Sequence, residues 1–177
     1  MIQTKYKLLN GFVLAIFLAL VCGFQSSFWY QVTGGVPAPQ LWMLVILYLA
    51  LYRSFFVAMG MVYGLALILK AFSATPLGVL WVTLFVMVSL SSFIKSRFFW
   101  PSNRYFVIAS TLFIFVFNIL FLIISKLTED SSVGFSFFTH FVEIALTTLF
   151  ATPMYWLLLK LDEWTLPEMG DSQGVTE

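Results

Sequence analysis

Charged residues are scarce in this chain of 177 amino acids: Asp, Glu, Lys and Arg make up only 10%, whereas 61% of residues are hydrophobic. Soluble domains carry about 25% charged residues. A surface so poor in charge would aggregate in water and suits hydrocarbon instead. The formal net charge is only +1, so the composition implies neither an acidic partner nor a nucleic acid.

Cysteine and histidine each occur once, as Cys22 and His140. A single cysteine cannot form an intramolecular disulfide, and a single histidine excludes a histidine-rich metal site. The motifs HExxH and GxSxG and a phosphate-binding glycine loop are also absent from the sequence. We therefore expect no metal, no cofactor and no catalytic residues, which indicates a protein that is not an enzyme.

Long apolar stretches fill most of the sequence and predict an all-α membrane protein with six transmembrane helices. A helix needs about 20 apolar residues to cross the hydrocarbon core. The expected helices cover residues 8–28, 39–52, 55–69, 77–94, 105–125 and 135–161. Residues 1–161 then form one transmembrane domain, and we expect the acidic segment 162–177 to be a disordered tail.

The first stretch follows Lys5 and Lys7 and therefore resembles a signal peptide. However, it continues toward Trp29 and Tyr30, which are typical interface anchors. We interpret it as a retained first span, followed by an outer loop over residues 25–38.

Residues 39–70 could form either one long helix with Arg53 inside it or two shorter helices, and the positive-inside rule separates these alternatives. With six spans, both termini are cytoplasmic, and seven of the nine Lys and Arg residues face the cytoplasm: Lys5, Lys7, Arg53, Lys95, Arg97, Arg104 and Lys160. Five spans divide the charges evenly and leave Arg53 in lipid, at a cost of roughly 2.5–3.5 kcal/mol or more. We therefore predict six spans. The short second and third spans must tilt, thin the bilayer or be shielded by neighbouring helices.

Polar residues inside the spans mark faces that pack against other helices, because small residues and hydrogen bonds drive helix pairing in lipid. Arg104, Thr111, Asn118 and Ser125 recur every seven residues and form one stripe, which favours a packing seam over a solute pathway. In the third span, Gly60 and Gly64 form a small-xxx-small pair that allows close approach of another backbone.

The last span carries the ionisable pair His140 and Glu143, three residues apart on one helix face that continues through Thr147. An intramembrane carboxylate is expensive and is therefore a functional candidate. Two interpretations stay open. The favoured one is a structural or partner contact, and the other is solute binding or proton chemistry.

Several short motifs occur in a characteristic order. They are Gln25-Ser26, Pro39-Gln40-Leu41, Ala50-Leu51-Tyr52-Arg53, the segment from Gly60 to Gly64-Leu65, Pro76-Leu77-Gly78, a basic cluster after the fourth span, Ala151-Thr152-Pro153-Met154-Tyr155-Trp156-Leu157-Leu158, and Leu161-Asp162. In this order the chain resembles the rod shape-determining MreD family over most of its length. It departs from that family at Lys70, where an acidic residue is usual, at Gln40, where Asp is frequent, and at His140 and Glu143, where charge tends to be basic.

The resemblance implies a non-enzymatic scaffold of the cell-elongation machinery in the bacterial inner membrane, where it supports peptidoglycan synthesis and cell shape. Its implied partners are MreC, a bitopic membrane protein, and also MreB, the peptidoglycan synthase pair and membrane lipids. We expect the partner-binding residues to be Gly60, Gly64, Asn118, His140, Glu143 and Thr147.

The fold implied by the resemblance is similar to that of the substrate-binding subunit of energy-coupling-factor vitamin transporters. The alternative function is therefore a small-solute binding subunit of a transporter. In that case His140, Glu143 and the outer loop would line the site.

Overall fold

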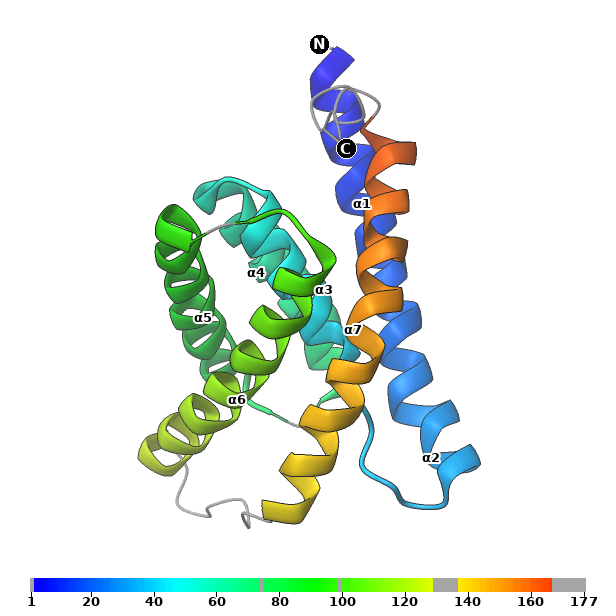
Figure 1. The fold of residues 1–177 in the computed structure, drawn as a ribbon, viewed down its shortest axis with the longest axis vertical. Helices are drawn as coiled ribbons and strands as arrows, with labels where there is room; N and C mark the ends of the chain where they lie inside the picture. Colours follow the sequence, from blue (N-terminus) through cyan, green and yellow to red (C-terminus); the bar gives the residue numbers. More distant parts are fainter. Residues whose placement is uncertain (1, 74, 99, 129–136, 167–177) are drawn as a thin grey trace.

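The computed structural model describes residues 2–73, 75–98, 100–128 and 137–166, and every regular element within these ranges is a helix (Figure 1). In order, the elements are α1 (Ile2–Gly23), the π-helical turn η1 (Phe24–Phe28), α2 (Trp29–Thr33), α3 (Leu41–Tyr52), α4 (Phe55–Phe72), α5 (Leu77–Phe98), α6 (Asn103–Thr128) and α7 (Phe137–Thr165). The predicted all-α class is confirmed.

The outer surface of the helices is strongly apolar. Phe56, Phe141 and Leu149 are 85%, 70% and 72% exposed. Five helical segments of the described chain are long and apolar enough to cross a membrane, and α3 is a shorter apolar helix. Helices satisfy their backbone hydrogen bonds internally, and lipid offers no groups that could pair with the backbone instead. These features indicate a multi-pass membrane protein.

Helix α3 lies at the centre of the fold and contacts α1, α4, α5, α6 and α7. Ten of its 12 residues are buried. Its length of about 18 Å falls well short of a hydrocarbon core of about 30 Å. Of the three ways to accommodate a short second span, the structure therefore shows shielding by neighbouring helices.

The chain breaks between α3 and α4, so residues 39–70 do not form one long helix. Arg53 and Ser54 both have extended backbone angles, with ψ values of 161° and 152°. The break places Arg53 at the end of a helix and not in the middle of one. The separation of the second and third predicted helices is confirmed.

The first helix is longer than predicted, because α1, η1 and α2 follow one another without a break up to Thr33. Gly34 ends the run in the left-handed conformation with φ of 63°, and its N–H donates to the carbonyl of Tyr30. Glycine adopts this conformation without a Cβ clash. Much of the segment predicted as an outer loop over 25–38 is therefore helical, and Gln25 and Ser26 lie in η1.

The last helix also runs further than predicted. It ends at Thr165, so Asp162 belongs to α7 and is buried, whereas we expected the tail to begin there. The physical reason is a set of internal partners for Asp162, described below. Residues 167–177, the rest of the predicted tail, lie outside the described residues. The beginning of α1 and the end of α7 lie at the same end of the molecule (Figure 1).

Candidate functional site

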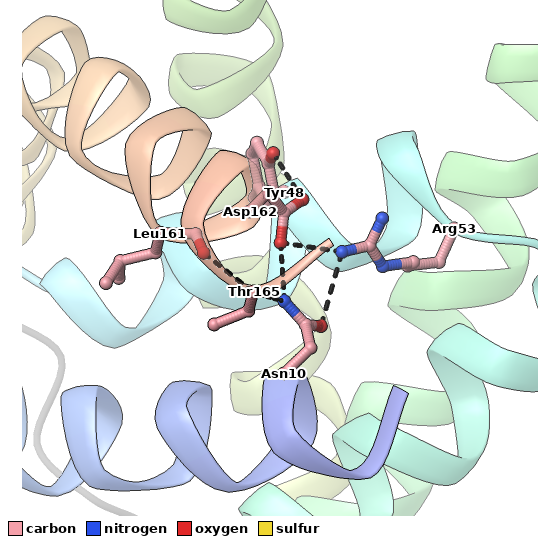
Figure 2. Close-up of polar contacts among 6 residues, drawn as sticks. All are labelled: Asn10, Tyr48, Arg53, Leu161, Asp162 and Thr165. Atoms are coloured by element: carbon pink, nitrogen blue, oxygen red, sulfur yellow. Dashed lines mark hydrogen bonds and ion pairs between the residues drawn. The ribbon is translucent and has the colours of Figure 1, made fainter. Parts of the chain in front are cut away.

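A buried polar cluster joins three distant segments at the end of the molecule that holds the start of α1 and the end of α7. We call it the inner cluster; its members are Asn10, Tyr48, Arg53, Asp162 and Thr165 (Figure 2). Arg53 Nη2 donates to Asp162 Oδ1 at 2.7 Å, and the two side chains are only 7% and 5% exposed. Tyr48 Oη donates to Asp162 Oδ2 at 2.7 Å.

Asn10 connects α1 to this ion pair. Its Nδ2 donates to Asp162 Oδ1 at 2.8 Å and to Thr165 Oγ1 at 2.7 Å, and its Oδ1 accepts from Arg53 at 3.3 Å. Lys95 from α5 donates to the carbonyl of Arg53 at 2.8 Å. A buried charge is tolerated where it is paired and hydrogen-bonded. The inner cluster meets that condition and joins α1, α7 and the α3–α4 junction, and Lys95 attaches α5 to it.

The inner cluster is not predicted from the sequence. The sequence does not single out Asn10, and we interpret Arg53 as a loop charge and Asp162 as the first residue of the tail. A signal is nevertheless present in the spacing of Ala151, Tyr155, Leu158, Asp162 and Thr165, which places all five on one helix face. All five are buried. A carboxylate that continues a buried stripe predicts an internal cation as its partner.

A cleft of about 470 Å³ opens at the opposite end of the molecule, and we call it the outer cleft. Its polar lining includes Gln25, Gln40, Asn118, His140 and Glu143. Aromatic side chains complete the walls; they include Tyr30, Trp42, Phe72, Phe117 and Phe121. The residues predicted for a solute site, namely His140, Glu143 and parts of the 25–38 segment, therefore lie around one cavity.

Glu143 is the centre of a hydrogen-bond network in this cleft. Its Oε2 atom lies 3.1 Å from His140 Nδ1 and accepts from Gln40 Nε2 at 3.0 Å. His140 and Glu143, expected on one face of the last helix, contact each other there. Thr147 Oγ1 accepts from the backbone N–H of Gln40 at 2.8 Å and donates to the carbonyl of Glu143 at 2.6 Å. The beginning of α3 is thereby attached to α7.

The six predicted partner-binding residues do not form one surface. Thr147 is fully buried, so its role is internal and not the partner contact that we expected. Asn118, His140 and Glu143 line the outer cleft. Gly60 and Gly64 lie on an exposed face of α4, where a Cβ atom at either position would meet no heavy atom within 4 Å. That face is open to a second helix.

The polar stripe of α6 is in part a packing seam, as predicted. Ser125 is buried, and Thr111 Oγ1 lies 3.0 Å from Thr148 Oγ1 of α7, whereas Asn118 lines the outer cleft. Arg104 is exposed and does not join the seam.

Within the described ranges, no group of three or more His, Cys, Asp or Glu residues is arranged to hold a metal ion. Comparisons with protein-family models, curated proteins and solved structures gave no match to this chain.

Proposed function

We propose that this protein is a non-enzymatic scaffold of the MreD type in the bacterial inner membrane. It binds an MreC-like bitopic protein and supports peptidoglycan synthesis during cell elongation, together with MreB and the peptidoglycan synthase pair. One observation carries the proposal: two of the motifs on which the resemblance rests, Ala50 to Arg53 and Leu161-Asp162, meet in the Arg53–Asp162 ion pair. They are 109 positions apart in sequence.

The charge distribution supports both termini in the cytoplasm. The start of α1 and the end of α7 share one end of the molecule, as an even number of crossings requires (Figure 1). Lys95 contacts Arg53 in the inner cluster, and Arg97 and Arg104 flank the nearby α5–α6 connection with exposed side chains. Basic residues of this kind face the cytoplasm and attract anionic lipid.

The exposed face of α4 supports binding of a partner helix. Gly60 and Gly64 are flanked on the same face by Phe56 and Leu67, which are 85% and 55% exposed. Glycines between larger apolar side chains form a shallow groove in which a second transmembrane helix packs closely. We assign this face to the transmembrane helix of the MreC-like partner.

Depletion of the protein from rod-shaped cells tests the proposal directly. We expect depleted cells to lose their rod shape, and we expect an MreC-like protein to co-purify from native membranes. Cells that remain rods, with no such protein in the purified material, would refute the scaffold function.

The outer cleft favours a second candidate function, the small-solute binding subunit of a transporter. Its carboxylate, amides and aromatic walls are the mixture found in small-molecule sites. A tightly bound solute in the purified protein, together with solute uptake that depends on it, would support this function over the scaffold.

A further inference from the structure

Buried polar side-chain atoms without a hydrogen-bond partner are concentrated around the outer cleft. In the described part of the chain, four buried side-chain N or O atoms have no hydrogen-bond partner: Gln25 Oε1, Gln40 Oε1, Asn103 Oδ1 and Asn118 Nδ2. Three of the four belong to residues that line this one cleft. Buried polar atoms in native proteins nearly always have partners, ordered water among them, so these three atoms can hydrogen-bond to a polar molecule in the cleft.

The geometry of Gln40 fixes which of its amide atoms lacks a partner. Its Nε2 donates to the Glu143 carboxylate, and a carboxylate can only accept, so the amide oxygen must be the unpartnered atom. Together with Gln25 Oε1 and the carboxylate itself, this gives the cleft three acceptor groups. Asn118 Nδ2 is a donor without a partner on another wall.

The charge of the lining selects against anions. Among the Asp, Glu, His, Lys and Arg residues of the described chain, Glu143 and His140 line the cleft, and no Lys or Arg does. Lys70 lies close by, but its ammonium group donates to the carbonyl of Thr75 at 2.9 Å. The lining therefore suits a molecule that donates hydrogen bonds and carries a positive charge or none.

Aromatic side chains form part of the wall of the outer cleft. Trp42 and Phe117 are perpendicular to each other, with ring centroids 5.4 Å apart, and Phe117 stacks on Phe121 at 5.8 Å. Ring faces attract both cations and other rings. We propose that the outer cleft binds a small aromatic cation with N–H donors, of the aryl amine or amidine class, with Glu143 as its counter-charge.

This inference rests on the cleft and not on the scaffold function, and it names the ligand class for the solute-binding alternative. Benzamidine, benzamide and benzoate are a matched set of probes, because they have nearly the same shape but carry a cation, no charge and an anion. Calorimetric titration of the purified full-length chain in detergent would measure the dissociation constant (Kd) of each. We expect saturable benzamidine binding with a Kd of about 1 mM or tighter, weaker binding of benzamide, and no saturable binding of benzoate.

Two variants assign the effect to the cleft. Glu143→Gln keeps the size and one acceptor but removes the charge, so we expect benzamidine binding to weaken by about tenfold. Glu163→Gln is the matched control, because Glu163 is exposed near the other end of α7. Asn118→Leu removes a buried unpartnered amide, so it should leave thermal stability unchanged or higher while benzamide binding weakens.

Each contrary result overturns the proposal. Benzoate binding as tightly as benzamidine would show that the cleft does not select a cation. Absence of saturable benzamidine binding to the wild-type chain would show that it is not a site for this class. Equal benzamidine affinity of the Glu143→Gln and Glu163→Gln variants would remove Glu143 from the site. All three results are independent of cell shape and of MreC co-purification, so the scaffold proposal stands or falls separately.

Discussion

Replacing Asp162 with alanine removes the carboxylate to which Arg53, Asn10 and Tyr48 all donate hydrogen bonds. Arg53 then loses the counter-charge that offsets its desolvation. Breaking a buried ion pair by removing one partner costs about 3–5 kcal/mol, and the neutral hydrogen bonds lost at the same site do not simply add to this value. We therefore expect Asp162→Ala to lower the free energy of unfolding by about 3–5 kcal/mol.

The adjacent residue provides the control. Glu163 is an exposed acidic residue on the same turn of α7, so Glu163→Ala should change the free energy of unfolding by less than about 0.5 kcal/mol. The double variant Arg53→Met with Asp162→Leu replaces both charges by apolar groups. Because such replacements of the ion pair are often neutral or stabilising, it should recover part of the stability lost in Asp162→Ala, whereas Tyr48 and Asn10 still lack their acceptor.

Unfolding in mixed micelles with increasing dodecyl sulfate, followed by tryptophan fluorescence, measures all of these variants under one condition. Similar destabilisation by Asp162→Ala and Glu163→Ala would refute the assignment of a buried ion pair. A double variant no more stable than Asp162→Ala alone would show that the uncompensated charge of Arg53 is not the main cause of the lost stability.

Three further outcomes are expected. Gly60→Leu should reduce MreC co-purification by about tenfold without loss of stability, because nothing lies within 4 Å of the added Cβ. Gly78→Leu, at an equally open position on α5, should leave MreC co-purification unchanged. Equal effects of the two substitutions would argue against the α4 face. Thr147→Val should destabilise the fold by about 1–3 kcal/mol, because the N–H of Gln40 loses its acceptor, whereas Thr147→Ser should stay within about 1 kcal/mol of wild type in the same unfolding assay. Reporters that are active only in the cytoplasm should give a signal at both chain ends, and opposite signals would contradict the six-span topology.

The helices could be predicted from sequence because hydropathy acts over whole segments. The break at Arg53 could be predicted because one charge in lipid is costly enough to decide between two topologies. The burial of α3 could not be derived in the same way. Its residues are apolar on every face, and apolar residues suit both lipid and a protein core, so only the packing of five other helices distinguishes them.

The outer cleft and the inner cluster could be predicted from the sequence to different extents. The contact between His140 and Glu143 follows from their spacing on one helix. The contributions of Gln40, Asn10 and Asp162 depend on contacts across 103 to 152 positions, which no local pattern specifies. Asp162 was also obscured by its neighbours, because an acidic residue before a segment with Gly, Pro and Ser resembles the start of a disordered tail.

Helix α3 has one more property that follows from its position. It contains neither glycine nor proline between Leu41 and Tyr52, and its side chains are held on all sides. Such a helix has no residue at which it would kink. Gln40 precedes one end, beside Glu143, and Arg53 follows the other, beside Asp162. A displacement of α3 along its axis would change the Gln40–Glu143 distance and the Arg53–Asp162 distance together, so α3 links the outer cleft to the inner cluster.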